Sequence, residues 1–92
     1  MISPSVRRQT SQIDTNSYFV YVLLSLKDNG WYIGSTEDVK KRLIEHNNGT
    51  VFSTKDRIPF ILIHFEYFIN NADAKSREVF LKSGFGREQL KS

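Results

Sequence analysis

The sequence predicts an α/β (more strictly α+β) domain in which helices pack against a small, mainly antiparallel sheet. Three segments are rich in aromatic and β-branched residues, a composition that is typical of strands. An Asn-Gly pair separates the first two segments, which favours a hairpin. Two further segments space their apolar residues three and four apart and start with capping residues, as amphipathic helices do.

The composition narrows the class of protein. With 92 residues the chain is long enough for one domain and too short for two. Hydrophobic residues make up 39% of it, which indicates a folded chain. It contains no cysteine, so disulfides and thiolate metal sites are excluded. The net charge of +3 permits nucleic-acid binding without requiring it.

The ends of the chain and its apolar runs predict a cytoplasmic protein with no membrane partner. The longest apolar run, residues 18–26, is too short for a helix that crosses a bilayer. Residues 1–17 are mostly polar and lack the apolar segment of a secretory signal, so we expect them to form a flexible arm. Residues 18–92 are then expected to form a single domain.

The first two strands form the predicted hairpin. In residues 18–26 both alternating sets of side chains are largely apolar, so this strand should be covered on both faces. Residues 27–30, KDNG, supply the turn, because Asn-Gly readily adopts positive φ angles. Residues 31–34, WYIG, form the returning strand.

The first helix is predicted within residues 35–49. Ser35 or Thr36 can cap its start, and the acidic pair that follows suits the positive end of the helix dipole. The pair Asn48-Gly49 should end it. A loop then closes at residue 59.

The third strand is predicted at residues 60–69. One alternating set is wholly apolar, whereas the other contains His64 and Glu66. We therefore expect this strand to be half exposed, or to face a second, more polar layer. His64 is given only a structural role.

The second helix is predicted within residues 70–84. Asn71 or Asp73 can cap it, and Gly84 should end it. Residues 85–92 are expected to be a short tail.

Charged side chains occur on the faces of both helices that should meet the sheet. In the first helix, Val39 and Leu43 define the apolar stripe, and Arg42 and His46 lie on or beside it. A charged group on such a stripe costs free energy unless something pairs with it.

The second helix has the same feature. Glu78 lies between Ala74 and Leu81 on the stripe. Together with the strand residues Tyr21 and Tyr32, these groups offer a carboxylate for a divalent cation, a guanidinium for a phosphate and hydroxyls for water. That set suits phosphodiester hydrolysis with one metal ion.

Each residue taken alone also has a structural interpretation. Tyr21 can be a core tyrosine, Glu78 can pair with Arg42 or reach solvent, and His46 can serve as an ordinary residue at a helix end. The combination is what favours a function.

The same residues resemble a known family. The motifs FVY at 19–21 and YIG at 32–34 are similar to the paired signature of the GIY-YIG nuclease domain. The segment KKRLIEHNNG resembles the family's helix, with its arginine ten residues after the second tyrosine and a histidine four residues later. ADAKSREVFLKSG resembles the later helix with its metal-binding glutamate. The resemblance covers residues 18–84 and is nearest to small stand-alone members related to the nuclease domain of the bacterial excision-repair subunit.

This resemblance implies a three-stranded antiparallel sheet flanked by helices and an endonuclease that hydrolyses one strand of DNA with one Mg²⁺ or Mn²⁺ ion. Branched, nicked or damaged DNA and a role in DNA repair follow from the same likeness. The implied site residues are Tyr21, Tyr32, Gly34, Arg42, His46 and Glu78.

The resemblance also implies a role for each side chain. Glu78 would bind the metal, and Arg42 would contact the scissile phosphate and stabilise its developing charge. Tyr21 and Tyr32 would position or deprotonate the attacking water, with either one as the base. His46 would assist, and Gly34 would let the chain turn close beside the site.

The sequence departs from the family pattern in places. The first motif begins with Phe19 instead of glycine, and residues 85–92 contain no equivalent of the asparagine found in some members. Lys55 is the nearest candidate for the basic residue that others carry after the first helix. The predicted nucleic-acid contacts are Lys40, Lys41, Lys55, Arg57 and Lys82.

Two alternatives to a nuclease remain at this stage. One is a nucleic-acid-binding module of the same fold without turnover. The other is a plain small domain whose polar groups are satisfied internally. Any DNA specificity in so short a chain would come from a partner or from DNA shape.

Overall fold

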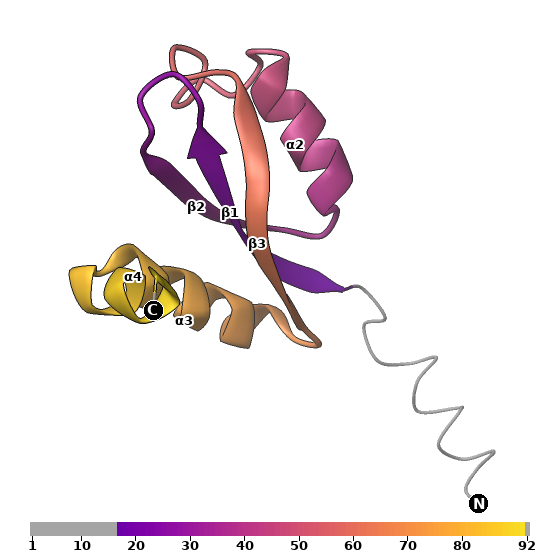
Figure 1. The fold of residues 1–92 in the computed structure, drawn as a ribbon. Coiled ribbons are helices and arrows are strands. Elements are labelled where there is room, and N and C mark those ends of the chain that lie inside the picture. The colour runs from indigo at the N-terminus through magenta and orange to yellow at the C-terminus, as the bar shows by residue number, and fades with distance from the viewer. Residues whose placement is uncertain (1–16, 92) are drawn as a thin grey trace, which may run out of the picture.

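A three-stranded antiparallel sheet with strand order β2-β1-β3 forms the middle layer (Figure 1). The computed structural model describes residues 17–91, so the predicted arm lies outside the described residues apart from Ser17. The strands are β1 (Tyr18–Ser25), β2 (Trp31–Thr36) and β3 (Phe60–Phe68), and the helices are α2 (Val39–Asn47), α3 (Asn71–Lys82) and α4 (Gly84–Lys91). The predicted fold class is confirmed.

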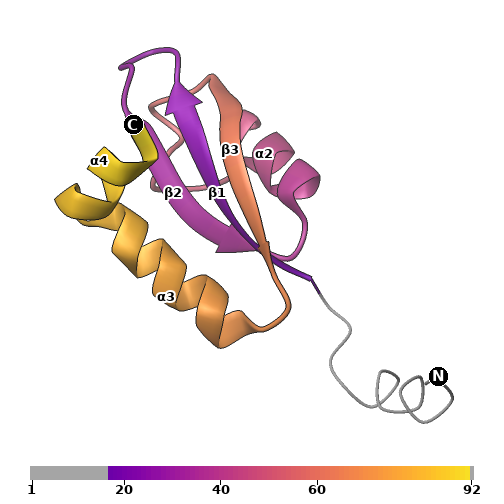
Figure 2. The same cartoon turned by 60° about the horizontal axis from the view of Figure 1, so that its bottom comes forward.

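Helices cover both faces of the sheet, with α2 on one side and α3 and α4 on the other (Figures 1 and 2). The central strand β1 alternates between the two sides, as predicted. Val20 and Val22 pack with α3, whereas Tyr21 and Leu23 pack on the side of α2. Because both sets of side chains are buried, β1 is apolar at nearly every position.

The hairpin turn lies where the Asn-Gly pair predicts it. Of this pair, only Asn29 takes the left-handed conformation, with φ of 62°. Ser25 organises the turn: its hydroxyl accepts hydrogen bonds from two backbone N–H groups of the loop and donates to the carbonyl of Arg57. Side-chain hydrogen bonds of this kind replace the backbone hydrogen bonds between β1 and β2 where the two strands separate.

Both helices start at other residues than the sequence suggests. The side chain of Asp38 caps α2 by accepting from the N–H of Lys41, because β2 continues through Thr36 and leaves no room for a helix start there. Similarly, Asn70 caps α3 by accepting from the N–H of Asp73.

The predicted tail is a helix. Residues Gly84–Lys91 form α4, which packs back onto α3. Gly86 makes this possible, because a Cβ atom at this position would collide with the backbone carbonyl of Phe80. Arg87 and Lys91 lie over the ring of Trp31, 5.6 and 5.9 Å from its centroid, and hold α4 against β2.

In the third strand, the alternating set of side chains that contains the polar residues is more buried than the wholly apolar set. The side chains of His64, Glu66 and Phe68 are half-buried toward α3, while Phe65 and Tyr67 remain more than half exposed. This part of the polar set faces α3, whereas Phe60 and Leu62 at the start of the strand pack on the α2 side. The wholly apolar set is the exposed one. The pairing of β1 with β3 shifts in register between Val22 and Leu23 of β1, and this shift changes the face to which the alternating side chains of β3 point.

Candidate active site

A chain of buried hydrogen bonds crosses the space between the sheet and α2. The hydroxyl of Tyr21 lies 3.0 Å from Nε2 of His46, and Nδ1 of His46 lies 2.7 Å from Oγ1 of Thr54. The three residues come from β1, α2 and the loop after α2, and each is at most 1% exposed. Thr54 contributed nothing to the sequence pattern, because an isolated threonine in a loop carries no signal.

The direction of these hydrogen bonds follows from counting protons. Thr54 Oγ1 donates to the carbonyl of Val51, so it accepts from Nδ1 of His46. In a neutral imidazole the other nitrogen must then be the acceptor. Nε2 of His46 therefore accepts the proton of the Tyr21 hydroxyl.

The protonation states agree with this arrangement. Burial lowers the pKa of His46 below its ordinary value of 6.5, and the charge of Arg42 lowers it further. Burial raises the pKa of Tyr21 to about 12, although the adjacent Arg42 guanidinium opposes the rise. A standing phenolate is therefore unfavourable at Tyr21, and the His46 ring stays neutral, which leaves Nε2 free to accept the hydrogen bond of the Tyr21 hydroxyl.

Gly34 lies directly under the Tyr21 ring. The two residues are cross-strand partners, so a side chain at position 34 would point to the same face as Tyr21. A Cβ atom there would lie 2.7 Å from the Tyr21 hydroxyl oxygen and 3.1 Å from Tyr32. The glycine thus leaves the room beside the backbone that the Tyr21 hydroxyl occupies, which gives its predicted structural role a more specific reason.

Tyr32 completes the aromatic wall of the site. It is half-buried on β2, with its ring centroid 6.2 Å from that of Tyr21 and 4.9 Å from that of His46. Unlike Tyr21, it retains exposed surface from which a hydroxyl can orient water.

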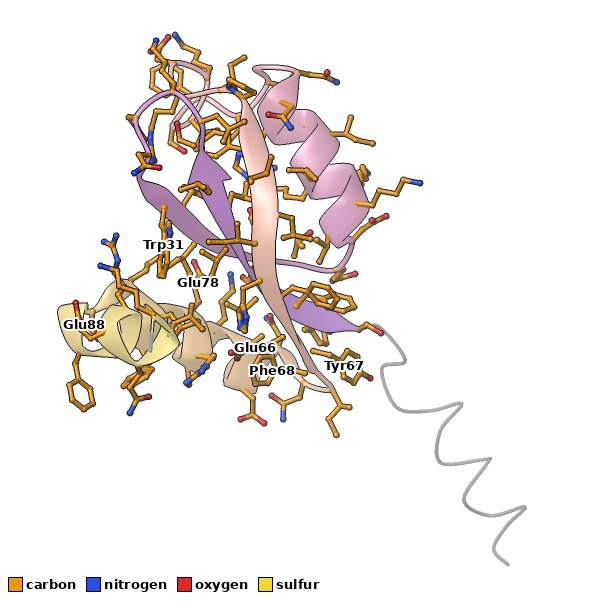
Figure 3. The ribbon with its side chains drawn as sticks, viewed as in Figure 1. Trp31, Glu66, Tyr67, Phe68, Glu78 and Glu88 are labelled. Atoms are coloured by element: carbon orange, nitrogen blue, oxygen red, sulfur yellow. The ribbon has the colours of Figure 1, made fainter. Side chains whose placement is uncertain are left out.

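Arg42 and Glu78 reach this cluster from opposite sides of the sheet. Arg42 on α2 pairs with Glu45 at 3.0 Å, and its charge lowers the pKa of Tyr21. Glu78 extends from α3 toward the sheet (Figure 3), and its charge raises the pKa of the same hydroxyl. Both predicted charges therefore act on Tyr21.

Two hollows of about 440 Å³ each flank the end of β2. One lies between β2 and α2 and includes Arg42 and Lys41 in its wall, and the other lies toward α3 and includes Lys75. Both are lined by Ser35 and Thr36. Of the site residues that the resemblance implies, only Arg42 lines either hollow.

Glu78 is held by lysines and keeps one oxygen without a hydrogen bond. Its Oε2 lies 2.8 Å from Nζ of Lys82, and its Oε1 lies 3.8 Å from Nζ of Lys75. Oε1 is buried and has no hydrogen-bond partner among residues 17–91. Burial alone raises the pKa of Glu78, but hydrogen bonding by Lys82 and the Ser35 hydroxyl, with the lysine charges, lowers it below 4.5.

A divalent cation of the Mg²⁺ or Mn²⁺ type fits this carboxylate. The buried Oε1 is ionised and lacks a hydrogen-bond donor, which leaves it available as a metal ligand. Within residues 17–91 no group of three or more His, Asp or Glu residues could form a closed cage. Mg²⁺ typically uses one or two carboxylates and completes its shell with water and substrate phosphate.

The predicted nucleic-acid contacts are placed unevenly. Arg57 forms a two-pronged ion pair with Asp28, at 2.6 and 3.2 Å, and so fixes the hairpin loop. Lys82 pairs with Glu78, and Lys55 lies 3.3 Å from Asp56. Lys41 lies in the wall of the same hollow as Arg42.

Comparison with known proteins identifies the family of this chain. The family model of the GIY-YIG catalytic domain matches residues 17–91. The chain belongs to the GIY-YIG family. Its likeness to that family, seen in the two tyrosine motifs, is thereby confirmed.

The relatives of this GIY-YIG chain are small proteins of similar length. UPF0213 protein CPE1444 of Clostridium perfringens is 42% identical over 65 residues, which cover 70% of this chain and 69% of the relative. UPF0213 protein YazA of Bacillus subtilis is 41% identical over 71 residues, which cover 76% and 71%. The solution NMR structure of UPF0213 protein BH0048 from Bacillus halodurans matches with a TM-score of 0.50 and 35% identity, over 80% of this chain and 81% of that one.

Membership of the GIY-YIG family gives the chain a nuclease domain, which acts on nucleic acid. In the part of the chain that the structure describes, no helix has the length and apolar character needed to pass through a bilayer.

Proposed function

We propose that this GIY-YIG protein is a metal-dependent DNA endonuclease that hydrolyses one phosphodiester bond in branched, nicked or damaged DNA. The observation that carries the proposal is the convergence on Tyr21. Its hydroxyl is hydrogen-bonded to His46, and its pKa responds to the charges of both Arg42 and Glu78. Acid–base chemistry at a phosphate needs a proton acceptor beside the hydroxyl and charges that act on it.

Tyr21 and His46 act as a pair in the proposed proton transfer. As water attacks the phosphorus atom, the Tyr21 oxygen accepts the proton of the water while its own proton moves to Nε2 of His46. The lowered pKa of His46 keeps its ring neutral before the reaction, so it has room for this proton. The transfer avoids a free phenolate, which the raised pKa of Tyr21 disfavours.

In the proposed reaction, Arg42 and Glu78 provide the electrostatic stabilisation. The Arg42 guanidinium faces the hollow between α2 and β2, where it binds the scissile phosphate and stabilises the charge that develops on its oxygens. Glu78 would hold the divalent ion through Oε1. When bound, such an ion polarises a phosphate oxygen and stabilises the leaving oxygen. Tyr32 orients the water from the β2 side.

A nucleic-acid-binding module without turnover is the second candidate, and one contact favours it. Lys82 lies 2.8 Å from Glu78 and would have to release the carboxylate before a metal could use both of its oxygens. In that case DNA would bind at Lys40 and Lys41 and would stay intact.

Cleavage assays with labelled nicked and branched DNA in Mn²⁺ or Mg²⁺ distinguish the two candidates. We expect Glu78→Gln to abolish cleavage and Glu88→Gln to leave it unchanged, since Glu88 is an exposed carboxylate on α4 that lies apart from Glu78 (Figure 3). Equal faint cleavage by the wild type and Glu78→Gln would indicate a contaminating nuclease and refute the enzyme proposal. DNA binding without cleavage in the wild type would support the second candidate.

A further inference from the structure

Three aromatic rings lie together on the part of the sheet that α2 leaves uncovered. Phe19 of β1 is the cross-strand partner of Tyr67, and Tyr21 is the partner of Phe65. The ring centroid of Phe19 lies 5.9 Å from that of Phe65 and 5.6 Å from that of Tyr67. We call Phe19, Phe65 and Tyr67 the aromatic platform.

The platform is not part of the core. Phe65 is 53% exposed and Tyr67 is 55% exposed, and none of the three rings belongs to either buried cluster of the described residues. Figure 3 shows Tyr67 and Phe68 pointing to opposite sides of β3, and only Phe68 packs on the α3 side. Adjacent exposed aromatic rings in a small protein indicate an interaction site.

The platform continues directly into the candidate active site. Phe19 is two residues before Tyr21 on the same face of β1, which places them roughly 7 Å apart along the strand. On its other side Phe19 pairs with Thr36, which lines both hollows at the end of β2. A strand of DNA with its phosphate at Arg42 therefore has the platform within reach of a neighbouring nucleotide.

We propose that the aromatic platform binds unpaired bases of the strand that is cut, so that the substrate carries unpaired nucleotides beside the scissile phosphate. This inference rests on the proposed nuclease function and specifies its substrate. Aromatic side chains next to a basic groove are the usual means of holding single-stranded nucleic acid, because every base has a face that can stack. In a continuous duplex the bases are stacked on one another and are not available to these rings.

A second copy of the chain fits the platform less well. The chain carries a net charge of +3, which opposes self-association and attracts a polyanion. The register shift in β3 also interrupts the regular edge that a second copy would need for strand pairing.

Binding assays without metal test the inference separately from catalysis. The probe is a short fluorescein-labelled single strand, compared with a blunt duplex of the same sequence, in EDTA and with Glu78→Gln as the protein background. We expect tighter binding to the single strand, and we expect Phe65→Ala and Tyr67→Ala each to weaken it about fivefold or more. Phe85→Ala is the matched control, since Phe85 is 70% exposed on α4 and away from the platform.

Conservative variants separate stacking from apolar contact. Phe65→Trp should retain single-strand binding, whereas Phe65→Leu should lose as much as Phe65→Ala. Equal affinity for single strand and duplex, or full binding by Phe65→Leu, would overturn the inference. So would a concentration-dependent dimer in sedimentation that Phe65→Ala abolishes. If the platform variants bind normally while Glu78→Gln alone abolishes cleavage, the nuclease proposal stands and this inference fails.

Discussion

The two faces of the sheet bury polar groups in different ways. On the α2 face, Tyr21, His46 and Thr54 are fully buried and are satisfied by hydrogen bonds between neutral groups. On the α3 face, Glu66 and Arg77 form an ion pair at 2.7 Å and keep 22% and 33% of their side chains exposed. A neutral chain of hydrogen bonds tolerates complete burial, whereas paired charges are retained where water still reaches them.

This difference separates two tasks. The α2 face holds a path along which a proton can move, and the α3 face holds Glu78 in place through packing of α3 and the ion pair next to it. The Arg77 side chain, adjacent to Glu78 in the chain, forms two hydrogen bonds with Glu66 and so ties α3 to β3. Changes on the first face should therefore alter reactivity, whereas changes on the second face, apart from Glu78 itself, should mainly alter stability.

The largest expected effect is on the α2 face. Tyr21→Phe removes the hydroxyl that links water to His46, and we expect cleavage to fall by roughly 10²–10⁴-fold, the usual worth of general acid–base catalysis. Glu88→Gln is the control, because it changes an exposed carboxylate on α4 outside the site. Single-turnover assays measure the cleavage rate, and circular dichroism checks that each variant is folded. A Tyr21→Phe protein that folds and cleaves within about twofold of the wild type would refute the proton path.

The next largest effect is on the α3 face. Gly86→Ala places a Cβ atom against the Phe80 carbonyl, so α4 must shift, and we expect the free energy of unfolding to fall by about 1–3 kcal/mol. Gly84→Ala is the matched control in the same helix, because a Cβ there meets no atom within 4 Å. Urea denaturation compares them. Equal stability of the two variants would show that α4 does not pack as described.

The smallest expected effect is a difference between the two faces in how their buried groups make the free energy of unfolding depend on pH. Burial holds the pKa of His46 below 6.5, so the unfolded state binds the proton first as the pH falls. The free energy of unfolding should therefore decrease as the pH falls below 6.5, by at most about 1.4 kcal/mol per pH unit. The hydrogen bond from Arg77 lowers the pKa of Glu66, so its stabilisation is present above pH 4.5 and is lost only as the pH falls further.

His46→Gln tests this separation. We expect the variant to lose the decrease that begins at pH 6.5 and to keep the decrease below pH 4.5. Denaturation in urea across this range is the measurement. If the variant keeps the full pH dependence of the wild type, His46 is not the group that titrates.

Much of the fold was predictable because its signals are local. The apolar first strand, the turn at Asn29 and the helical spacing of Ala74, Glu78 and Leu81 all depend on residues close in sequence. The position of His46 toward the sheet followed from the same helical spacing. The start of α2 was wrongly placed because a strand that continues through Thr36 competes with a helix cap at that residue.

The sequence by itself determined which elements form, in what order, and which side chains each helix turns toward the sheet, because the repeats of strands and helices are properties of short segments. Only the tertiary structure decided that Thr54 joins His46, that Arg57 serves the hairpin and that Phe65 and Tyr67 stay exposed. Those outcomes depend on contacts between distant segments and on one shift in strand register, and neither leaves a periodic signal in the chain.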